Sequence, residues 1–281
     1  MNDLSIIIVN LNNKQLLKDC LYSIYQQTKK ISFEVIVIDN ASTDGSVEMV
    51  KLSFPEAQVA ANQENVGFAK ANNQALALAN ARYALLLNND TVVKDGAFDK
   101  LVEFMDNHPR AGACGPRLLN PEGTIQRQGS WLSRRFWLAK KPVTVDFVVG
   151  ACLLVRKEVV DQVGYLDENL FFYNEDLDWC LTIRKAGYKI YFLPEAEVIH
   201  FGGASSRRAF NPQLLVEGFK GGLYFCRKHY GEFAYQSYRL LLILGLCLSL
   251  PLQLFNHQKL FAYWRIIGLA AIGQIARPMI K

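Results

Sequence analysis

The stretch LSIIIVNLNNKQLLKDCLYSIYQQTKKISFEVIVIDN, residues 4–40, decides the fold class. Two apolar runs within it, residues 4–10 and 33–40, have the length of buried strands. Between them, residues 14–27 carry apolar side chains at helical spacing. The chain therefore begins with a strand, a helix and a second strand, an order typical of proteins with a parallel sheet.

The same alternation of strands and helices continues along the chain. We expect a short helix, a brief strand, an Ala-rich helix and a fourth strand, in that order, at residues 45–53, 57–61, 67–80 and 83–87. Strands separated by helices predict an α/β fold with a mostly parallel, doubly wound central sheet flanked by helices. Such sheets bind ligands at the carboxyl ends of their strands.

The fourth strand runs directly into three polar residues, Asn88, Asn89 and Asp90. A turn alone would explain these residue types, because Asn and Asp form local hydrogen bonds with the backbone. In a doubly wound sheet, however, Asp90 lies at the same edge as Asn10 and Asp39, which also end strands. This shared position favours a ligand site over an isolated turn.

The middle of the chain, residues 112–150, is less regular and is interrupted by Gly and Pro. We expect hairpin strands and a mobile loop there. The loop includes the basic-aromatic stretch WLSRRFWLAKK, residues 131–141. A diphosphate clamp, a membrane contact and a solvated loop all remain open for this stretch.

Regular elements return further along the chain. A strand leads into a helix over residues 145–160, and another helix covers about 175–186 and stops at Gly187. Two short strands should then end at His200. From about residue 210 the pattern is helical to the end.

The composition is that of an ordinary globular protein, with 281 residues of which 51% are hydrophobic. The N-terminus lacks a cationic region followed by an apolar run and a cleavage site, so we expect no signal peptide and a cytoplasmic location. The six cysteines show no metal-ligand spacing, which favours reduced core residues over a disulfide frame or a zinc site.

The charges are distributed unevenly along the chain. Residues 1–203 carry 21 Lys and Arg against 24 Asp and Glu, whereas residues 204–281 carry 10 against 2. In the C-terminal part the basic residues alternate with long aliphatic runs. This pattern favours an anionic membrane surface, and not nucleic acid, as the partner.

The C-terminal part also contains two long apolar runs. Residues 240–258 include no Asp, Glu, Lys or Arg but are interrupted by Pro251, and residues 260–276 contain only Arg265 as a charged residue. A membrane span needs about 20 predominantly apolar residues, so the first run is borderline. Helices lying in the membrane interface, a re-entrant or spanning hairpin, and an oligomer or core surface all remain open.

Several titratable residues follow apolar stretches, as the lining of a pocket would. They are Asp39, Asp90, the pair Glu175 and Asp176, and His200. Each also has a purely structural explanation, for example a turn residue or an acid in the first turn of a helix. Their joint occurrence and their order carry more weight than any one of them.

Seven motifs occur in a recognisable order over about residues 3–206. They are SIIIVNLNN, VIDNASTDGS, NVGFAKANNQAL, LLLNNDT, FVVGACLLVRKEV, NEDLDWCLTIRKAGYKI and VIHFGGAS. In this order they resemble family 2 glycosyltransferases with the GT-A fold, especially the rhamnosyltransferases of bacterial surface polysaccharide assembly. One departure is Asn88, since the Asp-x-Asp element of the family usually begins with an acid.

The resemblance implies a divalent metal, Mg²⁺ or Mn²⁺, held by Asp90 and His200. An imidazole ligand would suit Mn²⁺ better than Mg²⁺. The resemblance also implies that Asp176 is the general base and that Glu175 places the acceptor or tunes its neighbour. A structural role in holding the helix is expected for Asp178, Trp179 and Arg184.

The resemblance further implies two groups of substrate-binding residues. The donor-binding residues would be Val9, Asn10, Asp39, Asn65, Gly67 and Asn89. The residues on the acceptor side would be Gly150, Ala151 and Trp179. Asp39 would accept a hydrogen bond from the nucleotide base.

The resulting hypothesis is a metal-dependent inverting glycosyltransferase that uses a dTDP- or UDP-sugar, with rhamnose the first guess. Residues 1–206 would form the catalytic domain, with a nucleotide-sugar half (1–110) and an acceptor half (111–206). Residues 207–281 would form a helical extension on the cytoplasmic side of the bacterial inner membrane, peripheral or monotopic, near a lipid-linked saccharide acceptor. A nucleotidyltransferase and an inactive membrane scaffold are the alternatives.

Overall fold

The computed structural model describes residues 1–128, 136–202, 211–253 and 256–273. By its internal contacts the chain divides into two compact units. The first comprises Met1–Leu166 and Asp176–Ser205, and the second comprises Asp167–Glu175 and Ser206–Lys281. One domain was predicted for residues 1–206, whereas in the structure Asp167–Glu175 packs with the C-terminal helices. The basic-aromatic stretch lies partly outside the described residues, and its described part begins with the short 3₁₀-helix η1 (Phe136–Leu138).

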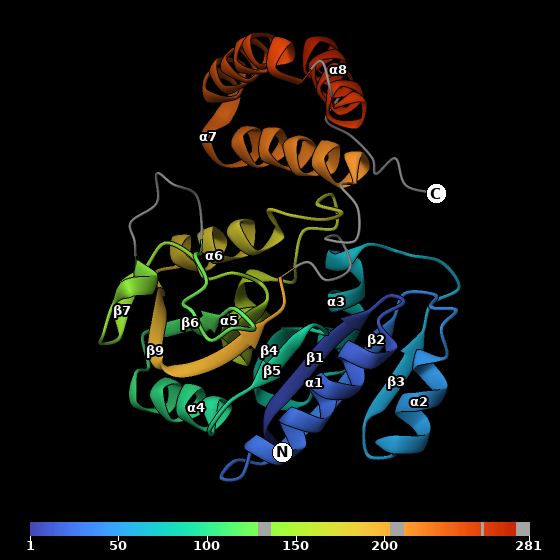
Figure 1. The fold of residues 1–281 in the computed structure, drawn as a ribbon. Helices are drawn as coiled ribbons and strands as arrows, with labels where there is room; N and C mark the ends of the chain where they lie inside the picture. Colours follow the sequence, from blue (N-terminus) through green and yellow to red (C-terminus); the bar gives the residue numbers. More distant parts are fainter. Residues whose placement is uncertain (129–135, 203–210, 254–255, 274–281) are drawn as a thin grey trace. The chain divides into compact units, whose positions relative to one another are not determined.

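The first unit is built around one sheet of nine strands (Figure 1). The strands are β1 (Asn2–Asn10), β2 (Phe33–Asp39), β3 (Gln58–Ala61), β4 (Ala81–Asn88), β5 (Thr91–Val93), β6 (Ala111–Leu119), β7 (Val143–Val145), β8 (Cys152–Arg156) and β9 (Lys189–His200). The helices of this unit are α1 (Lys14–Gln27), α2 (Ser46–Ser53), α3 (Phe68–Leu78), α4 (Ala97–Asn107), α5 (Lys157–Val163) and α6 (Glu175–Lys185).

The strand order is β3-β2-β1-β4-β8-β6-β9-β5, with β7 paired to β9. The first four strands in this order are parallel, which confirms the doubly wound arrangement expected for them. β8 then runs antiparallel between β4 and β6, so the sheet as a whole is mixed. Because β8 is antiparallel, its first residue, Cys152, pairs with Leu87 near the end of β4. The residues just before β8 therefore lie at the carboxyl ends of the parallel strands.

The two short strands expected before His200 form one strand, β9. Near Pro194, the pairing of β6 with β9 shows a shift of register and not a break between two strands. Leu193 pairs with Pro116, and the next pair joins Glu197 to Arg117. Such a bulge accommodates a proline, which has no N–H for the ladder, without ending the strand.

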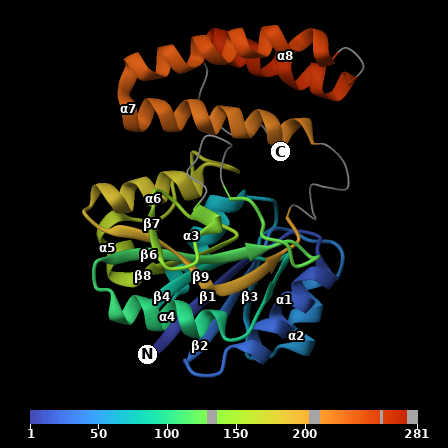
Figure 2. The ribbon, with the colours of Figure 1, turned by 60° about the vertical axis from the view of Figure 1, so that its left-hand side comes forward.

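Both faces of the sheet are buried. In β1, Ile6 and Ile8 belong to the core cluster that includes residues of α1 and α4, and Ile7 belongs to the cluster that includes residues of α3, α5 and α6. Figures 1 and 2 show these two helical layers on opposite faces of the sheet. Continuous apolar runs such as residues 6–9 are typical of parallel strands covered on both sides. All six cysteines are free thiols, and four of them are buried.

The second unit contains α7 (Pro212–Ser249), the short 3₁₀-helix η2 (Leu250–Gln253) and α8 (His257–Ile272). α7 is interrupted at Gly231, whose φ of 81° and ψ of −177° are not helical. The two halves of α7 pack together with α8, because Val216 from the first half and Leu246 from the second share a cluster with Ile266. The helical pattern expected from about residue 210 is thus confirmed for the described residues.

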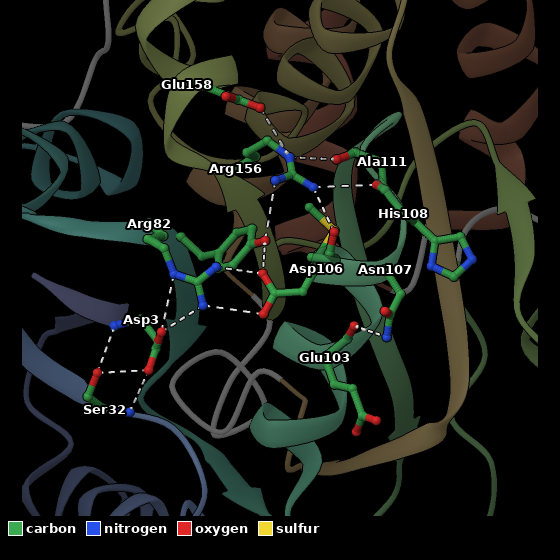
Figure 3. A network of polar contacts seen from close by, with 12 residues as sticks. Asp3, Ser32, Arg82, Glu103, Asp106, Asn107, His108, Ala111, Arg156 and Glu158 are labelled. Carbon is green, nitrogen blue, oxygen red and sulfur yellow. Dashed lines mark hydrogen bonds and ion pairs between the residues drawn. The ribbon is translucent and has the colours of Figure 1, made fainter.

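A polar network joins elements at the amino ends of β1 and β4 (Figure 3). Arg82 donates to Asp3 at 2.6 Å through Nη2 and to Asp106 of α4 at 2.6 Å through Nη1. The hydroxyl of Tyr83 donates to the same oxygen of Asp106 at 2.7 Å. Arg156, at the end of β8, donates to the backbone oxygen of Met105 at 2.7 Å. This network secures the edge of the sheet opposite to the carboxyl ends of the parallel strands.

Acidification should weaken this network through Asp3. Hydrogen bonds, first from Arg82 and then from Ser32, lower the pKa of Asp3 to about 2. Because the pKa of Asp3 is lower in the folded protein, its ionised carboxylate stabilises the folded state at pH values above about 4, the pKa in the unfolded chain. This contribution is lost as the pH falls from about 4 to 2. Because Arg82 is partly exposed, we expect Asp3 to contribute no more than about 1 kcal/mol to the free energy of unfolding.

The measurement is denaturant unfolding of the wild type and of Asp3→Asn between pH 7 and pH 2. The difference in free energy of unfolding between the two proteins should shrink below about pH 4. A difference that stayed constant over this range would contradict the role assigned to Asp3.

Candidate active site

Polar side chains meet at the carboxyl ends of three neighbouring strands. Asn10 ends β1, Asp39 ends β2 and Asn88 ends β4. The pairing registers place Asn10 beside Asp39 and Val9 beside Asn88. The edge predicted from the sequence is therefore present, and its polar residues come together there.

Asn10 connects the three strand ends. Its Nδ2 donates to Asp39 Oδ2 at 2.9 Å and to Ser42 Oγ at 3.2 Å. Its Oδ1 accepts a hydrogen bond from Asn89 Nδ2 at 2.7 Å. The exposed fractions of Asn10 and Asp39 are 0% and 1%. Hydrogen bonds in such a buried position are expensive to break, because the remaining partner is left unsatisfied.

The turn after β2 is built by Asp39 and Asn40. Asp39 Oδ1 accepts from the backbone N–H of Ser42 at 2.7 Å. Asn40 Nδ2 donates to Asn65 Oδ1 at 3.2 Å and to the backbone oxygen of Gly67 at 3.3 Å. The predicted residues Asn65 and Gly67 therefore join the same edge. Asn40 and Ser42, which the sequence analysis did not single out, provide the link.

Gly67 has a φ of 89°, in the region that favours glycine, and it precedes the first residue of α3. Its backbone N–H donates to Asn65 Oδ1 at 3.0 Å. This bond satisfies one of the donors that a helix start leaves without an intrahelical partner. Val9 is half-buried and packs against the core cluster on the side of α3.

Asp90 and His200 face each other. His200 Nε2 lies 3.3 Å from Asp90 Oδ1 and 3.3 Å from Asn88 Nδ2. Two strand contacts bring them together, since Thr91 of β5 pairs with His200 of β9 and Phe201 N donates to Asp90 O at 2.9 Å. The two side chains predicted as metal ligands are thus adjacent, although 110 residues of sequence separate them.

Gln126 fixes the orientation of the His200 ring. Its Oε1 lies 2.8 Å from His200 Nδ1, and its Nε2 donates to His200 O at 3.0 Å and to Asn120 Oδ1 at 3.1 Å. Because an amide oxygen only accepts, Nδ1 donates to it, and Nε2 is the ring nitrogen that faces Asp90. A lone Gln in an irregular segment gives no signal in the sequence, and only the fold reveals this contact.

Asp176 lies at the first turn of α6 beside Gly150. Its Oδ2 accepts from Gly150 N at 2.9 Å, and its Oδ1 accepts from Leu177 N at 2.8 Å. Burial raises the pKa of Asp176 above its usual range, although the two backbone hydrogen bonds oppose the shift. Gly150 and Asp176, which the sequence analysis assigned to the acceptor side and to catalysis, are therefore direct neighbours.

The remaining predicted residues have different surroundings. Ala151 is buried, and its backbone oxygen accepts from Asn88 N at 3.0 Å. Glu175 is 7% exposed. Trp179, which was also predicted to lie on the acceptor side, has a core setting: its side chain is 1% exposed, belongs to a core cluster and donates to Gly164 O at 2.9 Å. The cluster it joins includes residues of β1, β4 and β8, so this side chain packs against the sheet.

Comparison with known proteins decides the family. Residues 5–164 match the family described as Glycosyl transferase family 2. The chain belongs to this family. The match covers the parallel strands and extends through β8 and α5.

Two relatives of this family 2 glycosyltransferase are named as rhamnosyltransferases. It is 28% identical over 233 residues to the N-acetylglucosaminyl-diphospho-decaprenol L-rhamnosyltransferase of Mycobacterium tuberculosis, a match covering 70% of this chain and 76% of the relative. It is 24% identical over 196 residues to the dTDP-rhamnosyl transferase RfbF of Shigella flexneri, covering 66% of each chain. The chain thus resembles rhamnosyltransferases of its family.

Solved structures confirm the GT-A-like fold. The TM-score is 0.60 to Staphylococcus aureus TarS 1–349, at 16% identity, with 97% of this chain and 92% of that chain covered. It is 0.61 to GalNAc-T7 crystallised with UDP, GalNAc and Mn²⁺, at 17% identity, with 79% of this chain and 48% of that chain covered.

The geometry of Asp90 and His200 fits a divalent metal ion. Two ligand atoms at about 2.1 Å from one ion lie roughly 3.0–3.4 Å apart for ligand angles of about 90–110°. The observed separation of 3.3 Å falls in this range. Among the described residues no group of three or more His, Cys, Asp and Glu gathers around one point.

Proposed function

We propose that this family 2 glycosyltransferase moves a sugar, rhamnose as the first candidate, from a dTDP- or UDP-sugar to a lipid-linked saccharide of a growing surface polysaccharide, with inversion at the anomeric carbon. The names of the two relatives support the donor and acceptor classes. The polar edge formed by Asn10, Asp39 and Asn89 supports the position of the donor.

The observation that carries the proposal is the setting of Asp176. Two backbone N–H groups hold the two oxygens of its carboxylate, so the orientation of the group is fixed. Burial raises its pKa, and a higher pKa makes a carboxylate a better acceptor of the proton that the attacking hydroxyl loses. We assign the general base to Asp176 and a role in placing the acceptor to Glu175, with Gly150 and Ala151 on the acceptor side.

The donor side uses groups at the strand ends. Asp39 would accept from an N–H of the nucleotide base, while its hydrogen bonds to Asn10 and Ser42 keep the carboxylate in place. Asn65 and Gly67 shape the backbone of the pocket, together with Val9. Each of these residues is held by the fold before any donor binds, which reduces the entropy lost on binding.

Asp90 and His200 would hold Mg²⁺ or Mn²⁺. A bound divalent ion would neutralise the charge that develops on the pyrophosphate as the glycosidic bond breaks. Gln126 orients Nε2 of His200 for this role, because its Oε1 accepts a hydrogen bond from Nδ1. Asn88, in place of the acid usual at the first position, lies 3.3 Å from the same nitrogen.

The second unit supports association with an anionic membrane. One helix among the described residues, Pro212–Gln253, is long and apolar enough to cross a bilayer. Its non-helical break at Gly231 favours helices that lie in the interface instead. Beyond the break, α7, η2 and α8 expose large apolar side chains, namely Leu240, Leu241, Leu244, Leu248, Leu252, Phe261 and Trp264.

The distribution of basic residues also favours this surface as the membrane contact. Residues 233–281 carry five Lys and Arg and no acid, and Arg239, Lys259 and Arg265 lie in the described part of this stretch. Basic residues next to exposed apolar ones bind the anionic lipids of a cytoplasmic leaflet. We therefore place the enzyme at the cytoplasmic side of the bacterial inner membrane, peripheral or monotopic, where it would meet a lipid-linked acceptor.

Replacing Asp90 by Ala should abolish the metal-dependent part of donor binding while the protein stays folded. The carboxylate is one of two proposed protein ligands, and its loss leaves His200 alone. Mn²⁺ binding measured by electron paramagnetic resonance should weaken by about tenfold or more. The control is Asp161→Ala, which changes an exposed carboxylate of α5. If Asp90→Ala bound Mn²⁺ as tightly as the control, the metal assignment would be wrong.

Replacing Asp176 by Asn should slow transfer by about 10²–10⁴-fold with normal donor binding, because Asn keeps the shape but cannot accept the proton. Glu175→Gln should affect the affinity for the acceptor more than the chemical step. Single-turnover transfer with an acceptor saccharide, alongside donor titration, separates the two effects. Near-normal transfer by Asp176→Asn together with an inactive Glu175→Gln would show that Glu175 is the general base. Near-normal transfer by both variants would show that neither residue is the general base.

Replacing both Leu241 and Leu248 by Glu should reduce binding to vesicles that contain anionic phospholipid. Two exposed leucines that insert in the interface contribute roughly 1.5–3 kcal/mol each, so the partition coefficient should fall by about tenfold or more. The control is Leu52→Glu, since Leu52 of α2 is also exposed. Co-sedimentation that is equal for the double variant and the control would place the membrane contact elsewhere.

A further inference from the structure

The segment Asp167–Glu175 leads directly into Asp176, yet it packs with the C-terminal unit. It ends with two consecutive residues in the left-handed region, Tyr173 at a φ of 69° and Asn174 at a φ of 70°. Asn tolerates this conformation, but a bulky residue such as Tyr rarely adopts it. Such a backbone persists only where its surroundings hold it in place.

The first half of α7 provides these surroundings. Asn174 Nδ2 donates to the backbone oxygen of Gly218 at 2.9 Å. A Cβ added to Gly221 would lie 2.7 Å from Asn174 Nδ2 and 3.3 Å from the backbone oxygen of Tyr173. A Cβ added to Gly218 would lie 3.3 Å from the ring of Tyr173. The two glycines thus allow the segment to approach the helix closely.

A second contact fastens the other end of the segment to the same helix. Asp167 Oδ2 accepts from Tyr224 OH at 2.8 Å and from Lys228 Nζ at 2.7 Å. Although burial opposes ionisation, the hydrogen bonds from Lys228, Asn169 and Tyr224 lower the pKa of Asp167 to about 2. The carboxylate is therefore ionised at neutral pH, and its bond to Lys228 is charge-assisted.

The contacting residues of α7 share one face of the helix. They are Gly218, Gly221, Tyr224 and Lys228, with spacings of three and four residues. All of them precede the break at Gly231, whereas the exposed leucines follow it. The face that holds the segment is thus separate from the proposed membrane surface.

We propose that this face of α7 positions the catalytic carboxylate Asp176 by holding Tyr173 and Asn174 in the left-handed conformation from which α6 begins. Asn174 is a positioning residue. Gly218 and Gly221 form the surface of α7 against which Tyr173 and Asn174 pack, and we call this surface the seat. The inference rests on the proposed function for the role of Asp176, but the contacts between the segment and α7 do not depend on that role. A base displaced by about 1 Å loses rate steeply, so the seat should control catalysis without touching the substrate.

The decisive variant is Gly221→Ala, because its methyl group collides with the amide of Asn174. Ala is otherwise a better helix former than Gly, so the helix itself should not suffer. The matched control is Gly245→Ala in the second half of α7, where a Cβ meets nothing within 4 Å. Gly218→Ala, with its milder contact, serves as the variant to use if Gly221→Ala does not fold.

We expect kcat of Gly221→Ala to fall by about tenfold to a hundredfold with the KM for the donor within twofold of wild type. Gly245→Ala should match the wild type in both. Asn174→Gly, which tolerates a positive φ, should retain more activity than Asn174→Ala, which does not. Equal activity of Asn174→Gly and Asn174→Ala would show that the left-handed backbone is not what the reaction needs.

Hydrogen exchange provides a measurement that needs no activity. The amides of residues 169–176 should exchange about tenfold faster in Gly221→Ala than in Gly245→Ala. Equal exchange in the two variants would overturn the proposed seat, whatever the enzyme transfers. Faster exchange with unchanged kcat would overturn its role in catalysis. If the wild type transferred no sugar at all, the proposed function would fail, and the role of the segment in positioning a general base would fail with it. The exchange data would still decide whether α7 holds the segment.

Discussion

The buried amide of Asn10 joins the ends of β1, β2 and β4, and the candidate active site depends on this connection. It donates to Asp39 and accepts from Asn89, and Asn10 itself is fully buried. The apolar strands below it are covered on both faces, so the chain cannot shift in register without exposing core residues. The polar groups at the strand ends are therefore held in fixed positions, and a site for a nucleotide-sugar can be built on them.

Two antiparallel pairings, of β8 with β4 and of β9 with β5, add further polar residues to this edge. β8 begins where β4 ends, which brings Gly150 and Ala151 beside Asn88 and places Gly150 against Asp176. β9 runs antiparallel to β5 and delivers His200 to Asp90. A sheet of parallel strands alone would provide the donor side but neither of these pairs. The mixed topology is thus what brings the proposed donor, metal and base residues to one edge of the sheet of this family 2 glycosyltransferase.

The C-terminal unit has two faces with different chemistry. The half of α7 before Gly231 carries small and polar residues against the segment Asp167–Glu175. The half after Gly231 exposes leucines and carries no acid beyond Glu232. The break in the helix allows one continuous stretch of chain to present both. The extension, whose composition suggests an anchor, therefore also packs with the segment that leads to the proposed base, Asp176.

The sequence by itself determined the elements of the first half and the edge at which their polar residues meet. Buried strands and amphipathic helices have different periods, and the runs at residues 4–10, 14–27 and 33–40 follow them closely. The motifs also determined the family. These signals are local, because each depends on residues within one element or at its end.

Only the tertiary structure decided which distant residues touch. Two examples join residues that are far apart in the chain, namely the Gln126–His200 contact and the packing of Asp167–Glu175 on α7. A third, the burial of Trp179 in the core, depends on which face of its helix is covered. A lone Gln, a Trp in an amphipathic helix and two glycines in an apolar helix look alike in sequence whether they line a site, fill a core or seat a loop. Their roles follow from the packing of the sheet and helices, because hydrogen bonds and close contacts form only where the folded backbone brings the partners within reach.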